Sequence, residues 1–313
     1  MSNPKFFPMV VVAAVILALL APCAGADDPP QPSSGELIAK RFQGLNVGTA
    51  WRRVGEIEMK FDTYHPQGMA VIGDRMYISS VEVINRGEGR GVGHLFEANR
   101  RGELLRHVEL GEGAMYHPGG MDFDGERLWI SVSEYRPDSR SVVYSVDPET
   151  MNVRRIFEFG DHLGGILLDA KSNMLIANSW GSRRFYRWEL KSTDEGWKPL
   201  DPAHPLTRAN PSHYVDYQDG QWLPGTHLML CSGLKGYRVP ERGDGSFALG
   251  GMALIDTRTF DIVHEVPVPL WVGGRRPMTQ NPTYVEATEE GLRFYFMPED
   301  NRSTVYVYEP GID

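Results

Sequence analysis

Cysteine is almost absent from this chain of 313 residues, because only Cys23 and Cys231 occur. Cys23 lies in an N-terminal segment that we expect to be removed, which leaves Cys231 alone. One cysteine forms no intramolecular disulfide, no cysteine-based zinc site and no Cys-x-x-Cys redox pair. The stability of the protein therefore has to come from its core.

Positive charge is also in short supply. The chain has 32 Lys and Arg against 41 Asp and Glu, a formal net charge of −9. Phosphate groups would not be neutralised in bulk by such a surface. The composition predicts no nucleic-acid partner and no membrane partner once the N-terminal segment is cleaved. Apolar residues make up 41% and aromatic residues 11%, which is enough for a sizeable core.

Several sequence signals of catalysis are missing as well. There is no Gly-x-Ser-x-Gly nucleophile elbow. The glycine-rich stretch 87–91 is not followed by a helical pattern, so it is not a dinucleotide-binding fingerprint. Apolar residues at helical spacing are nearly absent throughout. The sequence therefore favours an all-β protein outside these enzyme classes.

The N-terminus has the pattern of a secretory signal. Lys5 precedes an apolar run from Val10 to Ala21, and Ala24-Gly25-Ala26 follows as a small-residue cleavage site. The run is shorter than the roughly 20 residues of a membrane span. We expect residues 1–26 to be a cleaved signal peptide and the protein to be exported, to the periplasm or outside the cell. An uncleaved anchor is the alternative.

A repeated pattern follows, with residues 27–44 interpreted as a linker and 45–313 as one domain. Five similar segments begin at His65, His117, His162, His213 and Asn281, at spacings of 52, 45, 51 and 68 residues. Each unit contains short β-rich runs separated by turn residues. Four strands in about 40–50 residues is typical of a β-propeller blade.

The fifth unit ends after its third strand, and the stretch from Trp51 to Met59 resembles a spare fourth strand. We expect this N-terminal strand to close the ring by pairing with the C-terminal blade. The count favours five blades. Six blades remain an alternative, because residues 191–212 or 234–280 could contain a divergent blade, and a two-domain β-sandwich is a further alternative.

The first two units share a Pro-x-Gly-Met signature, in HPQGMAVIGDRMYISSVE from His65 and HPGGMDFDGERLWISVSE from His117. This pattern resembles the propellers of NHL-repeat, strictosidine-synthase-like and gluconolactonase-type proteins. In the lactonases, the resemblance implies an axial calcium ion held by Glu, Asn and Asp. The corresponding positions here are Gln67, Gly119 and Gly164, which are poor calcium ligands, so calcium-dependent lactonase activity is only a third alternative.

Histidine occupies one equivalent position in four units, at His65, His117, His162 and His213, with Asn281 in the fifth. That position precedes the innermost strand, so these side chains are expected around one mouth of the central channel. Converging imidazoles suit a divalent transition metal, Mn, Zn or Fe, better than calcium. A structural role in blade turns and a metal-free ligand site are the alternatives.

Acidic residues end the second strand of three units, and we predict catalytic or metal-orienting roles for Glu82, Glu134 and Glu299. Basic and other polar side chains on the following loops form the predicted substrate-binding set of Arg86, Arg136, Arg183, Arg275, Trp180 and Asn281. The sequence thus predicts a metal-dependent lyase or hydrolase that acts on an anionic small molecule or oligosaccharide. A non-catalytic binding propeller is the alternative.

Overall fold

The computed structural model describes Met1 and residues 32–194, 196–238 and 245–311. The predicted signal peptide and the first part of the predicted linker lie outside the described residues. In the part of the chain that is described, no helix has the length and apolar character needed to cross a membrane.

The described strands form antiparallel sheets that follow the sequence units. The first sheet contains β2 (His65–Ile72), β3 (Arg75–Asn85), β4 (Arg90–Asn99) and β5 (Leu104–Leu110). The second contains β6 (Met115–Phe123), β7 (Leu128–Glu134), β8 (Ser141–Val146) and β9 (Val153–Phe159). The third contains β10 (Leu163–Asp169), β11 (Met174–Ser179) and β12 (Arg184–Thr193), whose outer edge is shared by β13 (Gly196–Pro199) and β14 (Leu206–Ala209). One parallel pairing of Gly165 in β10 with Gly120 in β6 joins it to the second.

The fourth and fifth units complete the arrangement. The fourth sheet contains β15 (Asp216–Trp222), β16 (Leu228–Arg238), β17 (Ser246–Asp256) and β18 (Ile262–Pro267). The fifth contains β21 (Thr283–Ala287), β22 (Leu292–Phe296) and β23 (Thr304–Pro310), and its outer strand is β1 (Trp51–Glu58). Trp51 pairs with Pro310 and Glu58 with Thr304, so the predicted closure by an N-terminal strand is confirmed.

The innermost strands close a ring. In chain order β2, β6, β10, β15 and β21 each contact the next, and β21 contacts β2. Apolar side chains fill the space between neighbouring sheets, as where Leu95 of β4 packs in one cluster with Ile130 of β7 and Val142 of β8. The chain therefore forms a β-propeller, and the all-β prediction is confirmed.

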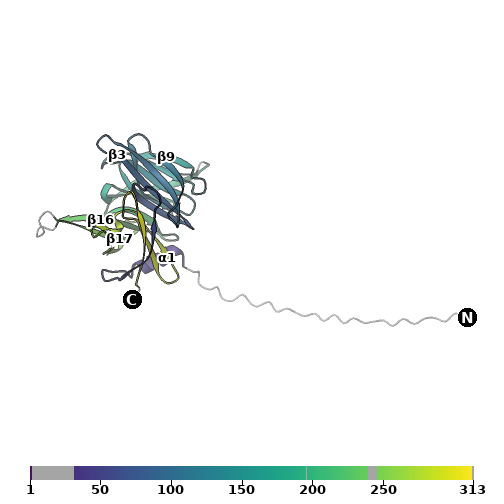
Figure 1. Cartoon of the computed structure of the whole chain (residues 1–313). Helices are drawn as coiled ribbons and strands as arrows, with labels where there is room; N and C mark the ends of the chain where they lie inside the picture. The colour runs from purple at the N-terminus through teal and green to yellow at the C-terminus, as the bar shows by residue number, and fades with distance from the viewer. Residues whose placement is uncertain (2–31, 195, 239–244, 312–313) are drawn as a thin grey trace. The chain divides into compact units, whose positions relative to one another are not determined.

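The two segments that could have contained a further blade extend existing sheets. Residues 191–212 supply part of β12 together with β13 and β14. Most of residues 234–280 belong to three parts of the fold: a long β16–β17 hairpin, strand β18, and a small hairpin of β19 (Trp271–Val272) and β20 (Arg276–Pro277). Figure 1 shows the β16–β17 hairpin running out from the rest of the domain.

The only α-helix among the described residues lies where the sequence suggested a linker. Helix α1 (Ser34–Phe42) begins with a capping box in which Ser33 and Glu36 satisfy each other's backbone N–H groups. Its Phe42 is buried, and Arg41 donates to the carbonyl oxygens of Thr288 and Gly291 at 2.7 and 2.6 Å. Figure 1 shows the helix beside the C-terminal strands. The compact unit therefore starts at Ser33 rather than at residue 45.

Glycine in the repeated signature permits the innermost strands to approach one another closely. A Cβ atom on Gly68 would lie 2.4 Å from the backbone nitrogen of Met121 on the neighbouring β6. A Cβ atom on Gly119 would lie 2.5 Å from the carbonyl oxygen of Gly164. Real side chains do not fit at these distances, so the motif reflects packing around the axis.

Asp219 of β15 ties the innermost strands together across the axis. Its buried carboxylate accepts backbone N–H groups from Met69 of β2 and Met121 of β6 at 3.2 Å, and from Thr283 of β21 at 3.3 Å. It also accepts the N–H of Gly220 at 3.0 Å. Burial raises the pKa of Asp219 to about 8, although these backbone hydrogen bonds act in the opposite direction.

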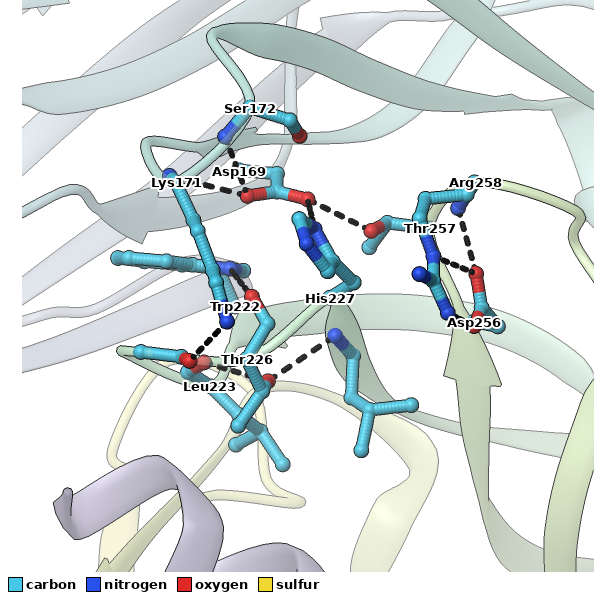
Figure 2. A network of polar contacts seen from close by, with 12 residues as sticks. Asp169, Lys171, Ser172, Trp222, Leu223, Thr226, His227, Asp256, Thr257 and Arg258 are labelled. Atoms are coloured by element: carbon cyan, nitrogen blue, oxygen red, sulfur yellow. Dashed lines mark hydrogen bonds and ion pairs between the residues drawn. The ribbon is translucent and has the colours of Figure 1, made fainter. Parts of the chain in front are cut away.

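A second buried aspartate joins the third and fourth units at the opposite ends of the innermost strands (Figure 2). Asp169, the last residue of β10, is fully buried and accepts the backbone N–H groups of Lys171 and Ser172. Its other oxygen accepts the hydroxyl of Thr257 at 2.7 Å and lies 3.2 Å from Nδ1 of His227. This network holds the turns that follow the innermost strands. The candidate site lies at the other end of these strands, where they begin.

Candidate functional site

A cavity of about 170 Å³ lies where the innermost strands begin. Three imidazoles, two aromatic rings and a carboxylate are among the groups that line it: His65, His117, His162, Tyr135, Trp180 and Asp216. Drug-sized ligands occupy pockets of roughly 300–1,000 Å³. This cavity therefore suits one small molecule or one unit of a longer molecule.

His117 and His162 form an electrically neutral part of the cavity wall. Their ring centroids are 5.8 Å apart, and the residues are 5% and 3% exposed. Burial, followed by the nearby His162 and His65, lowers the pKa of His117 well below its ordinary value. Burial likewise lowers the pKa of His162 to about 4. Both rings are therefore neutral at physiological pH.

The hydrogen bonds of these two rings differ. Nδ1 of His162 lies 2.9 Å from the carbonyl oxygen of Glu134. Because a carbonyl oxygen can only accept, Nδ1 carries the proton and the neutral ring keeps its lone pair on Nε2. Both ring nitrogens of His117 are buried without a hydrogen-bond partner among the described residues. Such an unsatisfied group is costly in a folded protein, and it suits a site that is completed by a ligand.

His65 is paired with a carboxylate. Its Nδ1 atom lies 2.7 Å from Oδ1 of Asp300, which also accepts Nδ2–H of Asn281 at 3.3 Å. Arg276 of the β19–β20 hairpin lies 3.5 Å from the other carboxylate oxygen. Burial opposes ionisation of Asp300, but His65, Asn281 and Arg276 hold the pKa of its carboxyl below the usual value. The ionised carboxylate therefore holds Nδ1–H of His65 and leaves Nε2 as the basic atom.

The backbone around this pair is held in an unfavourable conformation. Tyr64 and Asn301, which adjoin His65 and Asp300, have φ angles of 52° and 62°. The N–H of Asn301 donates to the carbonyl of Tyr64 at 2.5 Å, and the hydroxyl of Thr63 donates to the carbonyl of Asn301 at 2.7 Å. Positive φ at a residue as bulky as tyrosine is uncommon and costs free energy, and such strain often accompanies functional sites.

Aromatic rings form another wall of the cavity. Tyr135 stacks on His117 with centroids 4.0 Å apart, and Trp180 meets His162 edge-on at 4.7 Å. The guanidinium of Arg86, from the β3–β4 loop, lies 3.9 Å from the centre of the Tyr135 ring and 5.7 Å from that of Trp180. Three sequence units thus contribute to this wall, in which His117 and Arg86 cover the two faces of Tyr135.

The predicted ring of four imidazoles is only partly formed. His65, His117 and His162 line the cavity as expected, whereas His213 is exposed and lies three residues before β15 begins. The strand of that unit starts at Asp216, so a carboxylate lines the cavity there instead. Among the described residues, no group of three or more His, Cys, Asp or Glu side chains is arranged to hold a metal ion.

None of the three predicted catalytic carboxylates is among the residues that line the cavity. Glu82 lies 3.7 Å from Nε2 of His94. The carboxylate of Glu134 is held by Arg136 at 2.5 Å and Arg140 at 3.1 Å. Glu134 therefore contacts the site only through its backbone carbonyl oxygen, which accepts the hydrogen bond from His162. Glu299 accepts the backbone N–H of Thr304 at the start of β23. The carboxylate that contacts an imidazole of the cavity is Asp300, directly after Glu299.

The predicted substrate-binding residues also have different surroundings. Trp180 lines the cavity, Arg86 covers its aromatic wall, and Asn281 is buried behind it against Asp300. Arg183 is paired with Asp216 at 2.8 Å, and Arg136 with Glu134. Arg275 is exposed in the turn of the β19–β20 hairpin. Carboxylates therefore neutralise Arg136 and Arg183, whereas Arg86 and Arg275 have no carboxylate partner among the described residues.

A larger depression of about 440 Å³ lies at the seam between β1, β23 and the turn before β22. Arg52 and Glu309, which line it, form an ion pair at 2.6 Å. The imidazole cavity is the stronger candidate because it combines buried neutral histidines, a histidine–carboxylate pair and strained backbone.

Comparisons with solved structures concern the fold of the chain. The chain is similar to a mannose phosphorylase from Leishmania mexicana in complex with phosphate, with 14% identity, a TM-score of 0.50 and coverage of 82% of this chain and 88% of that one. It is also similar to the GH93 α-L-arabinofuranosidase of Fusarium graminearum with arabinobiose, with 11% identity, a TM-score of 0.48 and coverage of 82% and 97%. Such low identities concern architecture alone.

The narrower likeness to NHL-repeat and gluconolactonase-type propellers stays a prediction. Comparison with curated protein sequences found no match. A family profile, in contrast, matches residues 29–312, which is nearly the whole chain. The chain therefore belongs to the family described as "Family of unknown function (DUF6454)".

Proposed function

We propose that the imidazole cavity is the active site of an enzyme in which His65 is the general base and Asp300 its positioning residue. The observation that carries the proposal is the 2.7 Å contact between Nδ1 of His65 and the Asp300 carboxylate, beside a cavity that His65 itself lines. A carboxylate that holds Nδ1–H both orients the ring and stabilises the positive charge that forms on proton transfer.

The chemistry that this arrangement supports is proton removal from water or from a substrate group by Nε2 of His65. The side chain of His65 is 32% exposed, so a substrate can reach it. His117 and His162 remain neutral beside it and can donate or accept a hydrogen bond without adding charge. The reaction is thus hydrolysis, if water loses the proton, or elimination, if a substrate carbon does.

The substrate class that fits the walls is a single sugar unit, alone or at the end of an oligosaccharide. Trp180 provides a flat face of the kind that stacks on sugar rings, and the polar groups of the cavity suit hydroxyls. The two faces of Tyr135 are already covered by His117 and Arg86. The mannose phosphorylase described above is one protein of similar fold whose description names a sugar substrate. Its example supports the choice of sugars for the first assays.

The test is turnover of a panel of oligosaccharides and glycosides, with products detected by mass spectrometry. Wild type is compared with His65→Gln, Asp300→Asn and the neighbouring control Glu299→Gln. We expect His65→Gln to lower turnover about 10²-fold or more, the usual contribution of general base catalysis. Equal turnover by wild type and His65→Gln would overturn the proposal.

A transition-metal site on the same imidazoles is a second candidate, favoured by the two unpartnered nitrogens of His117. His65, His117 and His162 would have to move together to serve as ligands, because the described residues include no three such groups in a metal-binding arrangement. Mn, Zn or Fe are the ions that imidazoles suit. Elemental analysis of protein purified without chelator or His-tag, beside a His117→Ala/His162→Ala double variant, tests it. Near-stoichiometric metal that disappears in a folded double variant supports this candidate, and no metal in either rejects it.

A non-catalytic binding propeller would use the same cavity without proton transfer. In that case ligand binding would depend on Tyr135 and Trp180, whereas His65→Gln would change no reaction.

Export by the predicted signal peptide is part of the proposal as well, and it places the substrate outside the cytoplasm.

A further inference from the structure

Arg86 crosses from one sheet to the aromatic residues of two others. It follows directly after β3 in the first unit, whereas Tyr135 follows β7 and Trp180 follows β11. Its guanidinium lies 3.9 Å from the centre of the Tyr135 ring, and Tyr135 stacks on the buried His117 at 4.0 Å. The charge of Arg86 therefore lies close to the cavity, and it contributes to the lowered pKa of His117.

The other cations around the cavity already have carboxylate partners. Arg136 and Arg140 hold Glu134 at 2.5 and 3.1 Å. Arg183 and Lys235 lie 2.8 and 3.8 Å from Asp216, and Arg276 lies 3.5 Å from Asp300. In the described part of the chain, Arg86 has no carboxylate within ion-pair distance. It is the cation at this site whose charge is left for a ligand.

The contact of Arg86 with the rings leaves its hydrogen-bonding groups available. A guanidinium that lies over an aromatic ring still presents N–H donors at its edge. Two parallel donors at that edge match a carboxylate or phosphate, and they bind it more strongly than a neutral hydroxyl. The stacking also orders a long side chain in advance, which lowers the entropy lost on binding.

We infer that the cavity selects ligands that carry a compact oxyanion, a carboxylate or phosphate on a sugar-sized molecule, and that Arg86 binds this anionic group. The inference rests on the proposed function for the position of the site, and it adds the charge of the ligand. The anion would lie at the Arg86 edge while the ring of the ligand stacks on Trp180 and its hydroxyls face the imidazoles.

The inference predicts charge discrimination that depends on one residue. Calorimetry would measure the binding of glucuronate, glucose 6-phosphate and glucose to the full mature protein, to Arg86→Gln and to Arg90→Gln. Arg90 is a matched control, because it is the first residue of β4, directly after the loop that holds Arg86, is exposed and pairs with Glu88 at 3.4 Å. A charge-assisted hydrogen bond predicts at least about tenfold tighter binding of an anion than of glucose.

We expect that preference in wild type and Arg90→Gln, and its loss in Arg86→Gln. The comparison of glucuronate with glucose 6-phosphate shows whether a carboxylate or a phosphate is preferred. Equal binding of glucose and both anions, a preference that survives in Arg86→Gln, or no binding of either anion would each overturn the inference.

The His65→Gln variant separates this inference from the proposed function. If it keeps the preference for anions and its turnover equals that of wild type, the proposed general base is wrong and the role of Arg86 stands. If turnover of a neutral sugar depends on His65 and no anion is preferred, the proposed function stands and the role of Arg86 is wrong.

Discussion

His65 and Asp300 lie 235 residues apart in the chain, yet Nδ1 of one and Oδ1 of the other are 2.7 Å apart. The contact joins the first innermost strand to the loop before the last strand, so it forms only when the ring closes. Assembly of the site therefore depends on the ring closure in which β1 pairs with β23.

Replacing Asp300 tests whether the carboxylate positions His65. Asp300→Asn keeps the size of the side chain but removes its charge and allows it to donate a hydrogen bond to Nδ1. The wrong tautomer then places the lone pair away from the cavity, and we expect turnover to fall about 10²- to 10⁴-fold with a smaller change in KM. Glu299→Gln is the matched control. A change in KM alone would show that Asp300 does not act through His65.

The two buried imidazoles are predicted to stay neutral over the physiological range. Burial lowers the pKa of His162 to about 4 and that of His117 well below its ordinary value. Neither ring should therefore take up a proton between pH 5.5 and 8. A pH titration of the histidine side chains by NMR measures this directly. A midpoint above pH 6 for either ring would contradict the account.

Asp219 is predicted to stabilise the axis of the propeller. Asp219→Ala leaves four backbone N–H groups without the acceptor that they share, and each unsatisfied buried donor costs about 1–3 kcal/mol. We expect the free energy of unfolding to fall by more than about 3 kcal/mol. Asp261→Ala, an exposed control, should change it by less than about 0.5 kcal/mol. Urea denaturation followed by fluorescence gives both values.

The same residue predicts a dependence of stability on pH. The pKa of Asp219 is about 8 in the folded protein against an ordinary value of 3.8. Between these values the folded state holds a proton that the unfolded state has lost, so the contribution of Asp219 falls as pH rises from about 4 to about 8. Asp219→Asn should flatten this part of the curve. An unchanged slope in that variant would mean that Asp219 is ionised throughout.

Glycine in the repeated signature is predicted to be necessary for packing. Gly68→Ala would bring a Cβ atom to 2.4 Å from the backbone nitrogen of Met121, so we expect reduced stability and loss of soluble expression. Gly160→Ala is the control, because a Cβ atom there meets nothing within 4 Å. The melting temperatures of Gly68→Ala and Gly160→Ala test this prediction. Similar melting temperatures for the two variants would show that β2 and β6 can move apart without loss of stability.

The repeats predicted the fold because each unit carries its own strands and turns. Spacing alone located the innermost strands, and the incomplete fifth unit indicated closure by the strand before the first unit. Helix α1 was missed because its pattern is short and follows a proline-rich stretch. Its stability comes from contacts with distant turns, through Arg41 and Phe42, which local sequence does not reveal.

The site was predicted less completely than the fold, because several of its contacts depend on how distant segments fold together. Three of the four equivalent histidines line the cavity as expected, but His213 is exposed and lies three residues before β15 begins. Asp300 was passed over for the adjacent Glu299, since only the folded loop decides which of two neighbouring carboxylates faces His65. The role of Asp219 depends on contacts with three other strands. Pairing of the arginines with carboxylates, which singles out Arg86, also requires the three-dimensional structure.

The most direct test of the central claim is the protonation pattern of the His65 ring, read from long-range ¹H–¹⁵N NMR spectra at pH 8 and assigned by comparison with His65→Gln. The account predicts a proton on Nδ1, shifted downfield by its hydrogen bond to Asp300, and a bare Nε2 that a cavity ligand perturbs. The downfield shift should disappear in Asp300→Asn. A proton on Nε2, or a ring indifferent to Asp300→Asn, would contradict the proposal that these two residues form the base.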